Sequence, residues 1–247
     1  MVESLAEIPA IEPFLEQGYV AEVINPLKSG KEASAYLCRA GRRLGRALVV
    51  AKVYHDRDRR NFANAAQYTE GRVILNGQAR RAVAKKTEMG RTIETAFWVD
   101  HEFEVLSNLH YTGCDVPEVF VCTEQAILME YIGGEEGPAP QLQHAPIAPD
   151  EVPVLRDRLL GDIEQYLAND VVHGDLSAFN VLYRPGRLTV IDFPQAVDPR
   201  FNAHARRLLT RDLSNLAKYF ARHGHGFDAE EHAAGGLELS FPTVRHL

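Results

Sequence analysis

The stretch HGDLSAFN, residues 173–180, decides the fold because it places a carboxylate and a carboxamide five positions apart in a loop that follows an apolar strand. Asp175 can accept or orient the proton of an attacking hydroxyl, and Asn180 offers a neutral oxygen to a magnesium ion. Asp192 follows seventeen positions after Asp175, at the end of an expected strand over 188–191, and adds a second hard oxygen ligand. Mg²⁺ prefers one or two carboxylates together with substrate phosphates, and this set supplies them.

Either motif alone is more often a turn or a strand-end cap than a catalytic group. The ordered combination H-G-D-x-x-x-x-N followed by V-I-D-F is typical of a kinase-like ATP site. We therefore predict that Asp175, Asp192 and Asn180 belong to the catalytic set, with Asn180 and Asp192 as the metal ligands and ATP with Mg²⁺ or Mn²⁺ as the cofactors.

Lys52 is the lone charge in ALVVAKVY, residues 47–54, a run of the length and composition of a buried strand. A strand lysine at this place in a kinase pairs with the α- and β-phosphates and is held by a glutamate on the next helix. On the expected helix 92–109, Glu102 is the best candidate, because Glu104 lies roughly 200° away around the helix. Lys52 completes the predicted catalytic set, and the alternative is a surface lysine that extends from an edge strand.

Two further segments are candidates for nucleotide contact. Ser29, Gly30 and Lys31 lie at the tip of an expected hairpin within residues 19–40, where a phosphate-covering loop belongs, although the segment is neither G-x-G-x-x-G nor a Walker motif. Glu130 and Ile132 follow an apolar strand, so their backbone groups could bind an adenine edge. An ordinary connection between lobes would have the same sequence.

The wider pattern predicts an α+β chain in two parts. Residues 1–133 contain the strand-like runs and the helix 92–109, and they form an N-terminal lobe with an antiparallel sheet. Residues 134–247 begin with a proline-rich connection and form a reduced, mainly helical C-terminal lobe, with helices expected near 150–167 and 203–223. The tail beyond residue 224 is weakly patterned.

Composition excludes several classes of protein. The 247 residues carry a formal net charge of −7, and three cysteines without metal-ligand spacing (Cys38, Cys114 and Cys122) predict reduced thiols. Neither a membrane-spanning run nor a signal segment is evident, so we expect a cytoplasmic protein without membrane contact. Residues 55–91 are different, with nine Lys or Arg against four Asp or Glu. This basic segment, about 56–90, is either a solvated flexible insertion or a patch that faces phosphates of ATP, RNA or a partner.

Taken together, K-S-G-K-E-A, V-A-K-V-Y, M-E-Y-I-G, H-G-D-L-S-A-F-N-V-L-Y and V-I-D-F-P-Q-A-V resemble the RIO family of atypical serine/threonine protein kinases over about residues 20–222. The resemblance implies a bilobal protein-kinase-like fold, with phosphate transfer from ATP to a protein or to itself, or ATPase activity. It implies that Asp175 is the proton acceptor, that Lys52 contacts the ATP phosphates, and that Glu130 and Ile132 contact adenine. Asp192 would bind metal with Asn180 and is the candidate for a transient aspartyl-phosphate.

The motifs mix features of two RIO subgroups, which favours a divergent branch without the N-terminal winged-helix domain, a bacterial branch being one option. Contact with a ribosomal particle or RNA through residues 56–91 stays an option on this resemblance. Two other functions remain open. One is a small-molecule kinase of the aminoglycoside or choline type, although few residues follow Asp192 to build an acceptor pocket. The other is an ATP-gated binding module for ribosome assembly.

Overall fold

The computed structural model describes residues 8–55, 88–134 and 136–240, and these form two compact units. The first unit contains residues 8–55, 88–107 and 117–131, and the second contains residues 108–116 and those from 132 onward. Most of the basic segment predicted over 56–90, namely residues 56–87, lies outside the described residues. The predicted lobe boundary at residues 133 and 134 stays a prediction.

An antiparallel five-stranded sheet forms the frame of the first unit, in the order β1-β2-β3-β5-β4. The strands are β1 (Val20–Ser29), β2 (Ala33–Ala40), β3 (Leu48–Tyr54), β4 (Val119–Cys122) and β5 (Ala126–Glu130). They match the expected hairpins, and β3 is the apolar run that carries Lys52. In register, Lys52 lies opposite Ala35 of β2 and Ile127 of β5, so the lysine is on a central strand.

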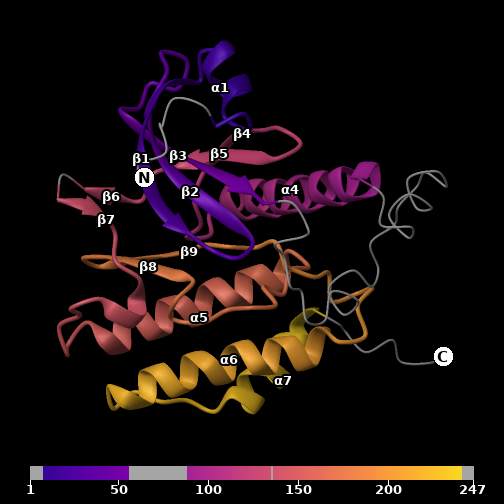
Figure 1. Ribbon diagram of the computed structural model, residues 1–247. Helices are drawn as coiled ribbons and strands as arrows, with labels where there is room; N and C mark the ends of the chain where they lie inside the picture. The colour runs from indigo at the N-terminus through magenta and orange to yellow at the C-terminus, as the bar shows by residue number, and fades with distance from the viewer. Residues whose placement is uncertain (1–7, 56–87, 135, 241–247) are drawn as a thin grey trace. The chain divides into compact units, whose positions relative to one another are not determined.

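The two faces of this sheet pack differently. Side chains of a strand alternate between faces, and Val49 and Ala51 of β3 join a fully buried cluster with Ile11 and Phe14 beside α1 (Glu12–Glu16). Lys52, between Ala51 and Val53, points to the opposite face, where its Nζ atom donates to Glu102 of the long helix α4 (Glu88–Tyr111). Figure 1 shows that α4 runs beside this sheet. The alternation of β3 therefore directs the lysine toward the helix.

Helix α4 departs from the sequence expectation in two respects. It begins at Glu88, four residues before the expected start at residue 92, and it includes Gly90, although glycine is a poor helix former. The helical spacing of Phe97, Leu106 and Leu109 in the sequence predicts that Phe97 lies on the packing face, yet Phe97 is 42% exposed, while its neighbour Trp98 is 3% exposed. Leu106 and Leu109 are buried, as that spacing predicts, and Trp98 is buried in place of Phe97.

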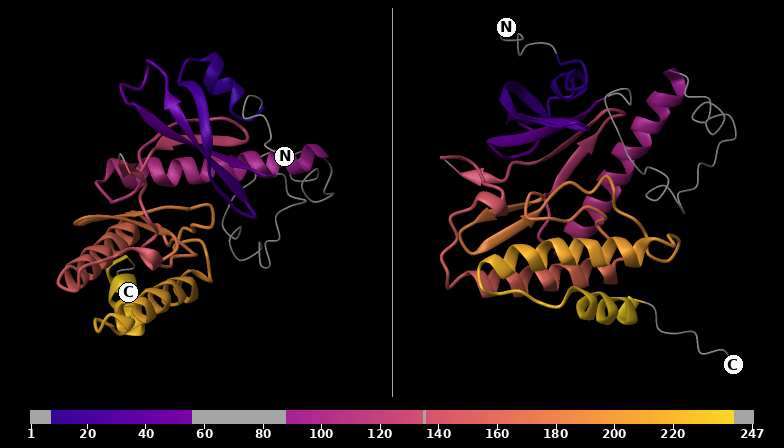
Figure 2. Two further views of the ribbon diagram at one scale, coloured as in Figure 1. Left: turned by 60° about the vertical axis from the view of Figure 1, so that its left-hand side comes forward. Right: turned by 60° about the horizontal axis from the view of Figure 1, so that its bottom comes forward.

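The second unit is mainly helical, as predicted. Its elements are β6 (Gly133–Gly134), β7 (Gly137–Pro138), the short 3-10 helix η2 (Leu142–His144), α5 (Val152–Ala168), β8 (Val181–Arg184), β9 (Arg187–Val190), α6 (Ala205–Arg222) and α7 (Ala229–Ser240). The helices α5, α6 and α7 lie together in both views of Figure 2, and the β8–β9 hairpin carries the loop 173–180 before it and Asp192 after it.

Apolar side chains at helical spacing account for the predicted helices of this unit. In α5 the buried side chains include Leu155, Leu159, Ile163 and Leu167, and in α6 they include Leu209, Leu213, Leu216 and Phe220. Gly224 follows α6 with φ +81°, and the amide of His225 donates to the carbonyl of Phe220 at 2.9 Å, which is the expected glycine cap.

Helix α7 is a correction, because the tail was expected to be weakly patterned. Asp228 caps it through its side chain, whose Oδ1 accepts from the amides of Glu230 at 2.9 Å and Glu231 at 3.1 Å. Ala233 is buried. The apolar face is built mostly from small residues, which gave little periodicity, so the Asp-x-x-Glu start was the available signal. In the part of the chain that the structure describes, no helix has the length and apolarity needed to cross a membrane.

Candidate active site

The loop 173–180 is fixed by hydrogen bonds from its first residues. Gly174 has φ +81°, a conformation that side-chain-bearing residues rarely adopt, so the glycine of H-G-D is a backbone requirement. The amide of Asp175 donates to Nδ1 of the buried His173 at 3.2 Å. Because Nδ1 must accept this bond, Nε2 carries the proton and donates to the carbonyl of Ile191 at 3.2 Å. His173 therefore ties the start of the loop to the residue before Asp192.

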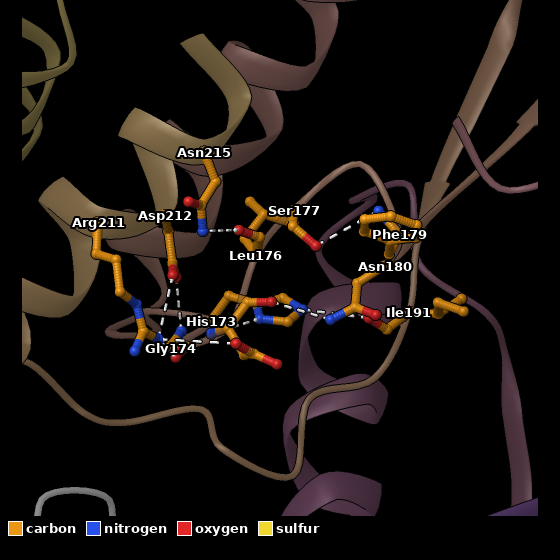
Figure 3. A network of polar contacts seen from close by, with 11 residues as sticks. His173, Gly174, Leu176, Ser177, Phe179, Asn180, Ile191, Arg211, Asp212 and Asn215 are labelled. Atoms are coloured by element: carbon orange, nitrogen blue, oxygen red, sulfur yellow. Dashed lines mark hydrogen bonds and ion pairs between the residues drawn. The ribbon is translucent and has the colours of Figure 1, made fainter. Parts of the chain in front are cut away.

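Asn180 closes the other end of the loop. Its side-chain Nδ2 donates to the backbone carbonyl of Asp175 at 2.9 Å. The backbone carbonyl of Asn180 accepts from the amide of Ile191 at 2.9 Å, and Figure 3 shows both Asn180 and Ile191. With the amide nitrogen used in the loop, the side-chain oxygen of Asn180 is the atom that can serve as a metal ligand. The same residue thus joins Asp175 to the strand end that carries Asp192.

Asp192 follows β9 with φ +74°, in the left-handed region that Asp tolerates better than most residues. Its negative charge acts on Asp175. Partial burial raises the pKa of Asp175 above the ordinary value, the guanidinium of Arg211 opposes this rise, and the charge of Asp192 adds to it. Asp175 and Asp192 lie in the same unit, and Asn180 links the backbone of Asp175 to Ile191, the residue before Asp192.

The donor set fits magnesium. Asn180 and Asp192 offer hard oxygen atoms, which Mg²⁺ prefers, and the remaining positions of its octahedron are usually filled by water and substrate phosphates. Among the described residues, no cluster of three or more His, Cys, Asp or Glu is present that would make an all-protein metal cage. The site therefore suits a metal that arrives with a phosphorylated ligand.

Two residues that the sequence analysis missed, Arg211 and Asp212 of α6, support the loop (Figure 3). Asp212 is 2% exposed, and its Oδ2 accepts from the amide of Gly174 at 2.8 Å. Burial raises the pKa of Asp212 to about 7, against the opposing effect of Arg211. Arg211 donates to the carbonyl of Gly174. A signal was available, since Asp212 is a lone carboxylate among the buried leucines of the α6 apolar face.

In the first unit, Lys52 and Glu102 form the ion pair that the spacing favoured. The Nζ atom of Lys52 lies 2.8 Å from both carboxylate oxygens of Glu102. Their side chains are 14% and 1% exposed. The pair is therefore largely shielded from water. Because Lys52 is on the central strand β3, the alternative of a surface lysine on an edge strand is wrong. Contact of Lys52 with ATP stays a prediction.

The phosphate-loop candidates lie between β1 and β2. The amide of Gly30 donates to the carbonyl of Ala33 at 2.9 Å, which closes the turn, and Lys31 is exposed. The hydroxyl of Ser29 shares a hydrogen bond of 3.0 Å with the hydroxyl of Ser34. The turn has the expected place and an exposed cation, while its contact with phosphates stays a prediction.

The adenine candidates are Glu130, the last residue of β5, and Ile132, two positions later. The amide of Glu130 donates to the carbonyl of Glu118 at 2.8 Å, and the carbonyl of Ile132 accepts from the amide of Ala139 at 3.0 Å. The amide of Glu130 and the carbonyl of Ile132 are thus engaged within the protein. The predicted contact with adenine therefore involves the carbonyl of Glu130 and the amide of Ile132.

The predicted residues thus form two groups. The structure brings Asp175, Asn180 and Asp192 together in the second unit, and it joins Lys52 to Glu102 in the first. That both groups serve one nucleotide stays a prediction.

Comparison with known proteins gives the chain its relatives. The family model of the RIO domain matches residues 39–233. Serine/threonine-protein kinase RIO1 of Homo sapiens is 27% identical over 214 residues, which cover 85% of this chain and 35% of that kinase. The RIO-type serine/threonine-protein kinase Rio1 of Haloferax volcanii is 27% identical over 226 residues, which cover 91% of this chain and 72% of that kinase. The chain thus spans about a third of the length of the human relative.

A solved structure confirms the fold class. The Rio2 kinase of Chaetomium thermophilum, in its ADP/Mg²⁺-phosphoaspartate complex, superposes with a TM-score of 0.65 at 19% identity. The match covers 96% of this chain and 71% of that one. The predicted α+β protein-kinase-like fold is therefore correct.

Proposed function

The chain belongs to the RIO domain family, and on that basis we propose that it is an ATP-dependent phosphotransferase of the atypical serine/threonine kinase type. One observation carries the proposal: within a single unit, the side chain of Asn180 donates to the backbone carbonyl of Asp175 at 2.9 Å, and the backbone carbonyl of Asn180 accepts from the amide of Ile191, the residue before Asp192, at 2.9 Å. Phosphate transfer needs a proton acceptor beside a metal site, and these three residues supply both.

Asp175 has the role of proton acceptor. Its carboxylate takes the proton of an acceptor hydroxyl while the hydroxyl oxygen bonds to the γ-phosphorus and the bond between that phosphorus and the β,γ-bridging oxygen breaks, which releases ADP. Asn180 and Asp192 would hold Mg²⁺, which neutralises charge on the phosphate oxygens when bound. The acceptor is a protein hydroxyl or one on the chain itself.

The first unit supplies the nucleotide contacts in this proposal. Lys52, kept in place by Glu102, contacts the α- and β-phosphates. Ser29, Gly30 and Lys31 cover the phosphates, with the backbone amides and the exposed lysine as donors to the anion. The carbonyl of Glu130 and the amide of Ile132 bind the adenine edge.

Asp192 is also the candidate for a covalent intermediate. The Rio2 relative from Chaetomium thermophilum was solved as an ADP/Mg²⁺-phosphoaspartate complex. In this chain an Asp192 carboxylate oxygen would bond to the γ-phosphorus as ADP leaves, and water would then cleave the acyl phosphate, so that the net reaction is ATP hydrolysis. The cytoplasmic location and the contact with RNA or a ribosomal particle through residues 56–91 stay predictions.

Two substitutions test the assignment. Asp175→Ala should leave Mg²⁺-ATP binding largely intact and remove phosphate transfer, because the proton acceptor is lost and the phosphate contacts remain. Asp192→Ala should weaken Mg²⁺-ATP binding as well, because a metal ligand is lost. Calorimetric titration with Mg²⁺-ATP and release or transfer of γ-labelled phosphate measure the two effects. Full activity in both variants would refute the proposal.

A further inference from the structure

The guanidinium of Arg211 is a junction between the loop and helix α6. It donates to the carbonyl of Gly174, and its Nη2 atom lies 3.9 Å from Oδ1 of Asp175 and 3.6 Å from Oδ1 of Asp212. A single charged group thus contacts the backbone before the proton acceptor, the acceptor carboxylate and Asp212, the buried anchor of the loop. Figure 3 shows Arg211 beside Gly174 and Asp212.

The surroundings make this contact stronger than an ordinary surface pair. Exposed ion pairs contribute little, partly because two mobile side chains must be ordered together. Here Asp212 has a side chain 3% exposed, and it is fixed by the amide of Gly174. Arg211 is therefore already ordered by the Gly174 carbonyl and by Asp212, and holding Asp175 needs little further ordering.

Asp175 needs such a restraint. Its side chain is 54% exposed, and the charge of Asp192 repels it. Asn180 holds only the backbone carbonyl of Asp175, so it does not fix the carboxylate. The positive charge of Arg211, whose side chain is 42% exposed, acts on this carboxylate.

We propose that Arg211 is a positioning residue for phosphate transfer, which holds the Asp175 carboxylate in the orientation that receives the acceptor proton. This inference rests on the proposed role of Asp175. Arg211 has no contact with substrate in it, and its effect passes through the geometry of Asp175 and the Gly174 carbonyl. It should therefore change the rate of transfer while the affinity for nucleotide stays the same.

The test compares three variants of the full chain. Arg211→Met keeps the length of the side chain and removes the charge, Arg211→Lys keeps the charge, and Arg206→Met is the matched control, since Arg206 is exposed on the same helix. For each, γ-labelled Mg²⁺-ATP gives kcat from phosphate release and self-labelling, calorimetry gives the Kd for Mg²⁺-ATP, and melting gives Tm. Asp175→Ala runs alongside.

The methionine variant should lose about tenfold to a hundredfold in kcat, the range expected for a charge about 4 Å away at a partly hydrated site. Its Kd for Mg²⁺-ATP should stay within about twofold, the lysine variant should regain a large part of the rate, and Arg206→Met should match the wild type. Three results would overturn the inference. They are a kcat of Arg211→Met equal to that of the wild type, a kcat of Arg211→Lys as low as that of Arg211→Met, or a fall in kcat accompanied by an equal rise in the Kd for Mg²⁺-ATP. If the wild type and Asp175→Ala have equal activity, the proposed function itself fails.

Discussion

At the scale of single residues, the ion pair of Lys52 and Glu102 gives a stability prediction that needs no knowledge of ligand. Lys52→Met leaves a buried carboxylate without its charged partner, and removing one member of a buried pair costs about 3–5 kcal/mol in the free energy of unfolding. In the double variant Lys52→Met/Glu102→Leu, no charge is left buried, so most of this loss should be recovered. Urea unfolding of the single and double variants measures both values.

The control for this pair is on the same sheet. Arg39 and Glu22 form an ion pair whose side chains are 58% and 54% exposed. Arg39→Met should therefore cost at most about 1 kcal/mol. A double variant as unstable as Lys52→Met would show that lost packing, and not the unpaired charge, sets the cost.

The same residues show what the sequence could predict. Glu102 was chosen over Glu104 because a helix places them on different faces, and that argument needed only the period of the helix. Asp212 was missed because its partner is the amide of Gly174, a backbone group 38 positions away. The contact itself leaves no pattern in the sequence, so the available signal was the position of Asp212 as a lone carboxylate on the apolar face of α6.

At the scale of elements, a buried polar network joins α5 to β9. Asp115, 5% exposed, accepts from Arg158 of α5 at 2.6 Å and from Arg187 of β9 at 3.1 Å. The carbonyl of Asp115 accepts from the amide of Val190 at 2.8 Å, and its amide donates to Asp162 of α5 at 3.4 Å. Asp115 thus contacts both the first and the last residue of β9, the strand that leads to Asp192.

Asp162 makes the network sensitive to pH. Burial, with the charge of Asp115, raises the pKa of Asp162 from 3.8 to about 6. The folded state therefore binds the proton more tightly than the unfolded state, and this group lowers the free energy of unfolding as pH rises from about 4 to about 6. Asp162→Asn keeps an oxygen for the amide of Asp115 and cannot ionise. The free energy of unfolding of Asp162→Asn should therefore rise relative to that of the wild type between about pH 4 and pH 6, and the difference at pH 7 should be roughly 1–3 kcal/mol.

Chemical unfolding at pH 4, 5, 6 and 7 measures the difference. Glu164→Gln, an exposed change on the same helix, should follow the wild type throughout. Parallel curves for the wild type and Asp162→Asn, or an asparagine variant that falls behind as pH rises, would contradict the prediction.

Elements with strong periodicity were predictable, and weakly apolar ones were not. The leucines of α5 and α6 recur at three- and four-residue spacing and are buried, as expected. Helix α7 consists mostly of Ala, Gly and Glu, and it packs against α5 and α6, which no local pattern reveals. In α4, Trp98 is buried and its neighbour Phe97 is exposed, and residue type alone did not decide between two adjacent large aromatic side chains.

At the scale of the whole molecule, the catalytic and metal candidates are in one compact unit, and Lys52, the candidate for phosphate contact, is in the other. The family assignment covers both units, because the RIO domain match extends over residues 39–233. The proposed function requires that the lysine and the two aspartates serve the same triphosphate. Sequence order and spacing predict this arrangement, since in kinases the strand lysine and the metal aspartate bind one nucleotide.

The most direct test of this claim is a crystal structure of the full chain with Mg²⁺ and a non-hydrolysable ATP analogue. The account predicts that Nζ of Lys52 contacts the α- or β-phosphate of the bound molecule and that its Mg²⁺ is coordinated by oxygens of Asn180 and Asp192. A nucleotide bound with its metal on other residues, or with Lys52 away from its phosphates, would contradict the account.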